Sequence, residues 1–171
     1  PIGVATTGFG GTSVNQWQPD GDLFQRWMMA RIHQLGPQGF RAVLWHQGES
    51  DVHMMEEEYY RKLKNTIVAS KQSAGWEFPW FVAITSYHNP KSPRFEGVRS
   101  AQQRIIDDGH ALLGPDTDVL TGDNRDLDGL GIHFSPKGLK AHGRMWAEQV
   151  TPFLEAALET SGKSIASKGT E

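Results

Sequence analysis

The segment with the clearest chemical potential is residues 45–51, Trp-His-Gln-Gly-Glu-Ser-Asp. It directly follows the apolar run from Phe40 to Trp45, which predicts a parallel strand covered on both faces. In an open α/β sheet, ligands bind at the carboxyl ends of the strands. The abrupt change to polar residues therefore predicts a functional loop at that edge, where Gln47 and Glu49 offer an amide and a carboxylate.

A second candidate is His133, which ends the loop 126–133 directly before the last predicted helix. Histidine exchanges protons near neutral pH because its ordinary pKa is about 6.5. A carboxylate on its second ring nitrogen would fix the tautomer, and Asp128 is the nearest candidate. His133 is therefore the best candidate for a general base, although a histidine in such a loop can equally be a hydrogen-bonding residue alone.

A glycine-rich loop lies near the start of the chain, at residues 8–13. Glycines allow positive φ angles and let backbone N–H groups approach a ligand closely. An isolated Gly-Gly pair is also common in tight turns. Gly10 and Gly11 therefore indicate a functional loop only if other motifs of the same kind of site are also present.

The elements that must position these residues alternate between strand and helix. Strands are predicted at 2–5, 40–45 and 80–85 with a weaker one at 119–120, and helical stripes at 23–35, 60–74, 98–106 and 136–154. Ser135 is the expected N-cap of the last helix, and Pro152 is expected to kink it. This order predicts a three-layer α/β/α sandwich with a parallel sheet over residues 1–160, followed by a polar, disordered tail at 161–171.

Composition excludes several kinds of function. The chain has 171 residues, the size of a single domain, and a net charge of −3 without long basic runs, so nucleic acid is not an expected partner. No apolar stretch approaches the ~20 residues that a membrane span requires. The chain has no cysteine, which excludes a thiolate nucleophile, a disulfide framework and a cysteine-based zinc site.

Four motifs together resemble those of the SGNH/GDSL hydrolase superfamily, and within it the sialate O-acetylesterase and family 6 acetylxylan esterase branch. The motifs are Gly10-Gly11-Thr12-Ser13 with Trp17, the segment 45–51, Val98-Arg99-Ser100-Ala101-Gln102, and 128–134 with Gly138. The resemblance extends from about Ile2 to Phe153. It implies a secreted or periplasmic serine esterase without a cofactor, which removes acetyl groups from a carbohydrate such as acetylated xylan or a sialic acid-like sugar.

The resemblance also implies roles for individual residues. Backbone N–H groups of Gly10 or Gly11 and the side-chain amide of Gln47 would form an oxyanion hole, in which one donor can be worth ~2.7–4 kcal/mol of barrier. Glu49 would order its loop or support His133, or merely cap backbone amides. Two further residues, Arg99 and Gln102, are expected to give structural support.

The chain departs from the family pattern at the acid. The family commonly has an aspartate three residues before the histidine, and that position is Leu130 here. Asp128 lies five residues before His133, so the loop would have to bulge to pair them. Asp126 or Glu49 could take its place.

The second departure concerns the nucleophile. The family's serine follows the first strand, upstream of Gly10, where this chain has only nine residues. Ser13 and Ser50 are poor substitutes because a nucleophile needs a base within hydrogen-bond reach. In a flavodoxin-like strand order the missing strand would be central. We therefore expect the serine and its strand to belong to a segment before Pro1 or to a separate segment or chain.

Two other classes of protein stay open. A metal-dependent hydrolase could draw on His46, Glu49, Asp51 and His53, which are suitable ligand types in one loop. A non-catalytic carbohydrate-binding relative that lacks its nucleophile would share all the motifs above.

Overall fold

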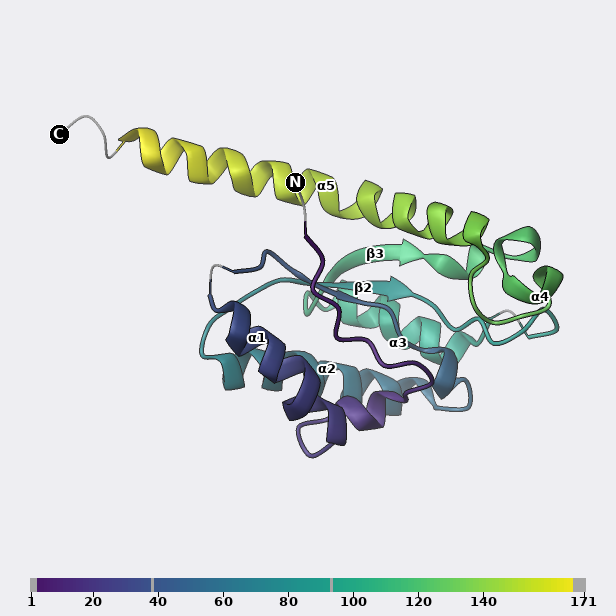
Figure 1. Cartoon of the computed structure of the whole chain (residues 1–171). Coiled ribbons are helices and arrows are strands. Elements are labelled where there is room, and N and C mark those ends of the chain that lie inside the picture. Colours follow the sequence, from purple (N-terminus) through teal and green to yellow (C-terminus); the bar gives the residue numbers. More distant parts are fainter. Residues whose placement is uncertain (1–2, 38, 93, 168–171) are drawn as a thin grey trace.

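The computed structural model describes residues 3–37, 39–92 and 94–167, with side chains described as far as residue 159. It is an α/β protein whose sheet has three parallel strands in the order β1-β2-β3. The strands are β1 (Val43–Trp45), β2 (Trp80–Ile84) and β3 (Leu112–Asp116). This confirms the expected layered α/β class, with helices on both faces of a parallel sheet (Figure 1).

One face of the sheet carries most of the helices. In chain order these are η1 (Val14–Trp17), η2 (Phe24–Met29), α1 (Ala30–Leu35), α2 (Glu56–Ala74) and α3 (Glu96–Asp107). Their apolar side chains form the core with the strands: Trp80 and Val82 of β2 are buried with Leu63 and Ile67 of α2 and Ile105 of α3. Full burial of one such side chain stabilises the fold by about 1.5–3 kcal/mol.

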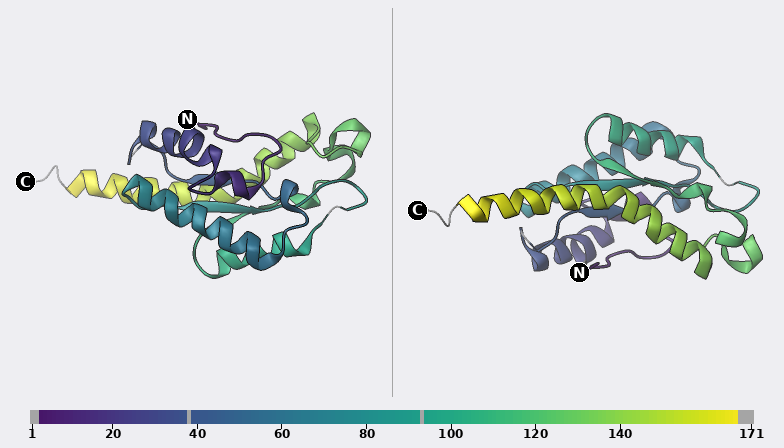
Figure 2. Two further views of the ribbon diagram at one scale, coloured as in Figure 1. Left: turned by 90° about the horizontal axis from the view of Figure 1, so that it is seen from below. Right: turned by 90° about the horizontal axis from the view of Figure 1, so that it is seen from above.

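The other face is covered by the long helix α5 (Pro136–Ser167) (Figure 1). Phe153 of α5 packs edge-to-face on Phe81 of β2, with ring centroids 5.6 Å apart. Leu44 and Leu112, the register neighbours of Phe81 on either side, are still 43% and 42% exposed. The helix therefore covers the middle of this face and leaves its flanks open, and its far end extends beyond the sheet (Figure 2).

The ends of two helices follow the sequence pattern. Helix α2 has three glutamates in its first turn and ends at Gly75, whose φ of 83° is a left-handed conformation that favours glycine. Helix α5 begins with Pro136, and the Ser135 hydroxyl accepts a hydrogen bond from the Gly138 N–H at 3.1 Å. The predicted N-cap is confirmed.

Two predicted strands are wrong. Residues 3–5 form no strand, and Ile2 lies outside the described residues. The strand expected at Val119–Leu120 is replaced by β3, which ends at Asp116. In the sequence, Gly114 and Pro115 look like the end of a strand. In the structure, a Cβ at position 114 would lie 2.8 Å from the backbone of β2, so glycine allows β3 to lie close to β2. Proline is tolerated because β3 is an edge strand.

The C-terminal part of α5 also differs from expectation. The helix continues through Pro152 and reaches Ser167, so the prediction of a disordered tail is wrong as far as Ser167. Residues 168–171 lie outside the described residues. Within the described part of the chain, no helix has both the length and the apolar character needed to cross a membrane.

Candidate active site

The loops that follow the three strands meet at one edge of the sheet. The loop after β1 approaches the loop after β2 so closely that a Cβ at Gly48 would lie 2.2 Å from the Thr85 carbonyl oxygen. Glycine is therefore required at position 48. Gln102 of α3 links the same loops, since its amide donates to the carbonyls of Gln47 (3.0 Å) and Thr85 (2.9 Å) and accepts from the Thr85 N–H (2.8 Å). The expected supporting role of Gln102 is confirmed.

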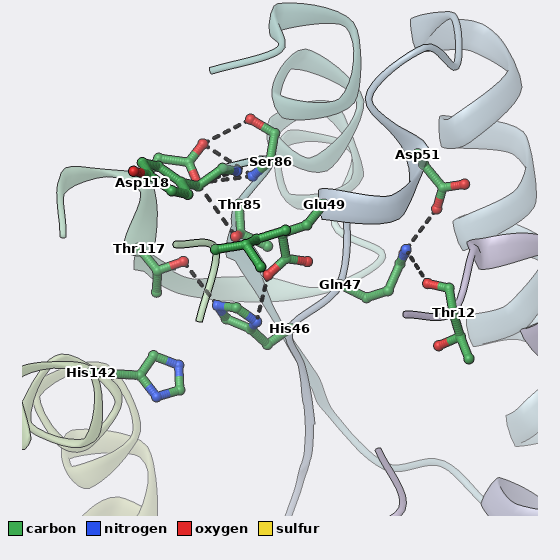
Figure 3. Close-up of polar contacts among 12 residues, drawn as sticks. Thr12, His46, Gln47, Glu49, Asp51, Thr85, Ser86, Thr117, Asp118 and His142 are labelled. Carbon is green, nitrogen blue, oxygen red and sulfur yellow. Dashed lines mark hydrogen bonds and ion pairs between the residues drawn. The ribbon is translucent and has the colours of Figure 1, made fainter. Parts of the chain in front are cut away.

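Gln47 is buried and its amide is fully used. The amide nitrogen donates to the Thr12 carbonyl (3.0 Å) and to Asp51 Oδ2 (2.6 Å), while the amide oxygen accepts from the Tyr59 hydroxyl (3.0 Å) (Figure 3). Both N–H groups therefore have partners within the protein. In this arrangement Gln47 braces the glycine-rich loop, and its expected role as an oxyanion donor stays a prediction that would require one of these two hydrogen bonds to be released.

Asp51 anchors the same loop from the other side. Its carboxylate accepts from the Ser13 hydroxyl (2.5 Å) and from the Val14 N–H (2.8 Å). Ser13 also caps η1, where its oxygen accepts from the Asn15 N–H at 3.2 Å. Because its hydroxyl proton is directed at a carboxylate and not at an imidazole, Ser13 is not placed as an activated nucleophile.

Gly10 and Gly11 lie on the exposed side of the braced loop. Gly11 has a φ of 73°, the left-handed region that glycine adopts without strain. Both glycines are exposed, and their N–H groups have no hydrogen-bond partner among the described residues.

His46 points to the opposite side of the strand end from Gln47 (Figure 3). Its Nε2 lies 2.9 Å from the Thr117 hydroxyl, and its Nδ1 lies 3.5 Å from Glu49 Oε1. The Glu49 carboxylate thus pairs with His46 and not with His133. Of the two functional roles considered for Glu49, ordering its own loop is the one that the contacts support.

His142 of α5 is a site residue that sequence reasoning missed. Its ring lies against His46 (centroids 4.9 Å apart) and stacks on Phe134 (4.7 Å), and its Nε2 accepts from the Trp146 Nε1–H at 3.0 Å. Burial, followed by the nearby charges of His46 and Arg125, lowers the pKa of His142 to about 4. The four-residue spacing to Trp146 places both rings on one side of α5 and was a usable signal.

Asp118 holds the ends of β2 and β3 together. This buried carboxylate accepts from the Ser86 N–H (2.9 Å) and hydroxyl (2.8 Å) and from the Tyr87 N–H (2.9 Å) (Figure 3). Arg99 of α3 bridges Asp118 and Asp116, each at 2.8 Å. Burial is the largest single influence on the pKa of Asp116 and raises it, but the hydrogen bond from Arg99, the charge of Arg99 and the hydrogen bond from the Asp118 N–H together outweigh burial and lower the pKa. The expected supporting role of Arg99 is confirmed.

His133 is exposed at the end of its loop, with 83% of its side chain accessible, and its Nδ1 lies 3.2 Å from Asp126 Oδ2. Asp128, the partner first expected, makes no such contact. Leu127 and Asp128 have φ angles of 48° and 55°, and this left-handed turn places Asp126 beside the imidazole. Asp126, one of the alternatives considered from the sequence, is therefore the carboxylate that contacts His133.

Gly131 makes room for that pairing. A Cβ at this position would lie 1.6 Å from Asp126 Oδ1, so any side chain would displace the carboxylate. The Gly131 N–H also donates to the Asp126 carbonyl at 3.0 Å. The loop is therefore shaped around Asp126.

The four side chains considered for a metal centre do not converge. Glu49 pairs with His46, whereas Asp51 is bound to Ser13 and Gln47 on the other side of the strand end. His53 is exposed and has its ring against Phe95. In the part of the chain that the structure describes, no group of three or more histidine, aspartate or glutamate residues could hold a metal ion.

The fold and the site together define an α/β protein with a histidine–aspartate pair and free backbone donors on loops around its sheet. A family model described as "carbohydrate esterase, sialic acid-specific acetylesterase" matches residues 1–152. Because the match covers most of the chain, the protein belongs to this family of carbohydrate esterases. Neither the curated proteins nor the solved structures include a match.

Proposed function

We propose that this protein is a serine esterase that removes O-acetyl groups from a carbohydrate, with His133 as general base and Asp126 as its partner. The observation that carries the proposal is the contact between His133 Nδ1 and Asp126, which leaves Nε2 of an exposed ring free for a nucleophile. A carboxylate on Nδ1 fixes the tautomer that such a base requires.

In the proposed reaction, a serine hydroxyl attacks the acetyl carbonyl carbon while His133 Nε2 takes its proton. The carbonyl oxygen becomes an oxyanion, and the free N–H groups of Gly10 and Gly11 are its proposed donors. Collapse of the intermediate breaks the bond to the sugar oxygen, which takes the proton from His133. Water, deprotonated by His133, then attacks the acetyl-serine; the bond to the serine oxygen breaks, the serine oxygen takes the proton back from His133, and acetate is released.

We place the nucleophilic serine on a segment outside residues 1–171. Ser13 is bound to Asp51, and no serine of the described chain contacts His133. Strand β1 is an edge of the sheet on its side away from β2, and its Leu44 is partly exposed. A further parallel strand along β1 would satisfy its free backbone groups and end at the same sheet edge as Gln47.

The substrate that we favour is an O-acetylated sialic acid or a similar sugar, because the matched family is described as sialic acid-specific. Acetylated xylan is the alternative. Turnover of the two substrates by the same preparation distinguishes them.

The decisive test is acetate release by the full-length gene product from 4-nitrophenyl acetate and from O-acetylated sialic acid. We expect His133→Ala to lower kcat by at least about 10³-fold, since a base and the nucleophile it activates act as one unit. His53→Ala is the matched control, because His53 is another exposed histidine, on the loop after β1, and its ring contacts only Phe95 among the aromatic residues described. Equal activity of the two variants would refute the role of His133.

The position of the serine is tested with a fluorophosphonate, which labels activated serines. We expect the label on a peptide outside residues 1–171 and its loss in His133→Ala. A label on Ser13 or Ser50 would overturn the placement. Sugar binding without turnover and without label would indicate the non-catalytic relative instead.

A further inference from the structure

Arg125 stands directly before Asp126, at the start of the loop that carries His133, and only 3% of this residue is exposed. Its guanidinium lies between two aromatic rings, 3.8 Å from the ring centre of Tyr87 and 4.3 Å from that of Phe134. Tyr87 belongs to the loop after β2, and Phe134 follows His133. The stack therefore joins the sheet edge to the end of the histidine loop.

The guanidinium N–H groups bind three backbone carbonyls. Nε donates to the Leu120 carbonyl (2.6 Å), Nη2 to that of Thr117 (3.2 Å) and Nη1 to that of Ile132 (2.8 Å). Leu120 and Thr117 follow β3, whereas Ile132 immediately precedes His133. One side chain thus fastens the backbone beside His133 to the end of the sheet.

Backbone hydrogen bonds also join the two ends of the loop 126–133. The Asp126 N–H donates to the His133 carbonyl at 2.9 Å, and Arg125 and Phe134 form an antiparallel bridge. Within the described residues, no carboxylate lies within ion-pair distance of Arg125. The interactions of the buried Arg125 guanidinium are therefore its hydrogen bonds to the three carbonyls and its contacts with the two rings.

We propose that Arg125 is a positioning residue for the proposed base: it closes the ends of the loop 126–133 so that His133 stays paired with Asp126. This inference rests on the proposed function of His133. Lysine cannot replace Arg125, because its N–H donors all sit on one nitrogen and cannot reproduce the planar spread of three nitrogens that each bind a carbonyl, nor can an ammonium group stack flat between two rings.

The test is chemical rescue in the full-length protein. Arg125→Ala leaves a slot between Tyr87 and Phe134 that matches a free guanidinium ion. We expect the variant to lose at least about tenfold in kcat with KM nearly unchanged, because a small misplacement of a catalytic group can cost about 10²-fold. Guanidinium at low millimolar concentration, far below denaturing levels, should restore a large part of the loss.

Arg104→Ala is the matched control. Arg104 also lies on a tyrosine ring, 4.0 Å from the centre of Tyr60, but it belongs to α3 and pairs with Glu57. We expect little change in kcat for this variant and no response to guanidinium. Restoration by guanidinium only in Arg125→Ala would separate positioning from a general effect of the salt.

A second readout does not depend on turnover. Hydrogen exchange at the backbone N–H groups of Asp126 and Gly131 should accelerate in Arg125→Ala and slow again with guanidinium, because both groups donate within the loop. If Arg125→Ala does not fold, Arg125→Lys should fold and show the same loss of kcat and of protection without rescue.

The proposal is overturned if a folded Arg125 variant keeps its kcat and its amide protection, or if guanidinium fails to restore the alanine variant. A wild-type protein without esterase activity would refute the proposed function alone, and amide protection would still decide whether Arg125 orders the loop.

Discussion

At the scale of single residues, the pairing of His133 with Asp126 shows how much a two-residue turn decides. Leu127 and Asp128 both occupy the left-handed region, which costs of the order of 1–3 kcal/mol for each non-glycine residue. Such a conformation persists only where the surrounding structure holds it. The contacts of Asp126 and Arg125 supply that support, and the turn directs Asp128 away from the imidazole.

Exchange of the two aspartates for asparagine tests this assignment. Asp126→Asn should lower kcat by about 10²–10⁴-fold, because the amide no longer holds His133 in the tautomer of a base. Asp128→Asn is the matched control two residues away and should retain activity near the wild-type level. Steady-state kinetics on 4-nitrophenyl acetate measures both variants. A greater loss in Asp128→Asn would restore the partner first expected from the sequence.

Gln47 illustrates what residue type alone cannot reveal. The segment 45–51 correctly predicts a polar loop at the end of a strand, but an amide can either point at a ligand or brace a neighbouring loop. The structure directs it to Thr12 and Asp51, so its contribution to the site is the position of Gly10 and Gly11. The direction of a side chain depends on contacts between distant segments, which a single sequence does not show.

At the scale of elements, one buried carboxylate joins the loops after β2 and β3. We expect Asp118→Ala to destabilise the protein by about 3–5 kcal/mol, because Arg99 and the N–H groups of Ser86 and Tyr87 lose a buried partner. Urea unfolding measures the change. Asp123→Ala, which removes an exposed aspartate paired with Lys137, should change the free energy of unfolding by less than about 1 kcal/mol. Equal effects would show that Asp118 is not an anchor.

Helices could be predicted where the apolar residues repeat regularly over several turns, or where capping residues mark the ends of the helix. Helix α2 has both an apolar stripe and a glycine stop, and α5 has a serine–proline start, so both were recognised. Strand β3 was missed because Gly114 and Pro115 interrupt its apolar run. Their suitability depends on the close approach of β2 and on the edge position, which are tertiary properties.

At the scale of the whole molecule, the proposed site draws on segments far apart in the sequence. Loop 10–13 is hydrogen-bonded to Gln47 and Asp51, which follow β1, whereas His133 lies in the segment between α4 (Asp126–Gly129) and α5 (Figure 1). That these segments form one site is an expectation from the sequence and stays a proposal, whereas the structure shows which residues fasten each segment to the sheet edge. The fastening residues are Asp51, Asp118 and Arg125, and their partners lie up to 38 residues away in the chain, as Ser13 does from Asp51.

The contact between α5 and the loop after β1, made by His142 and His46, makes the stability of the protein depend on pH. His142 of α5 is packed against His46 and Phe134, and in the folded protein its pKa is lowered from 6.5 to about 4, first by burial and then by His46 and Arg125. Between these two values the unfolded chain binds a proton that the folded protein does not. The free energy of unfolding should therefore fall as the pH is lowered from 6.5 towards 4, by at most about 1.4 kcal/mol per pH unit for this group.

Urea unfolding of the full-length protein between pH 4 and pH 7 measures this slope. His142→Gln should reduce it, because glutamine does not titrate and still offers an acceptor to Trp146 Nε1. Some slope should remain, since burial also lowers the pKa of His110. The control His53→Gln replaces an exposed histidine and should leave the slope unchanged. If the wild type and His142→Gln lose stability equally as the pH falls, then His142 is not held neutral between the sheet edge and α5.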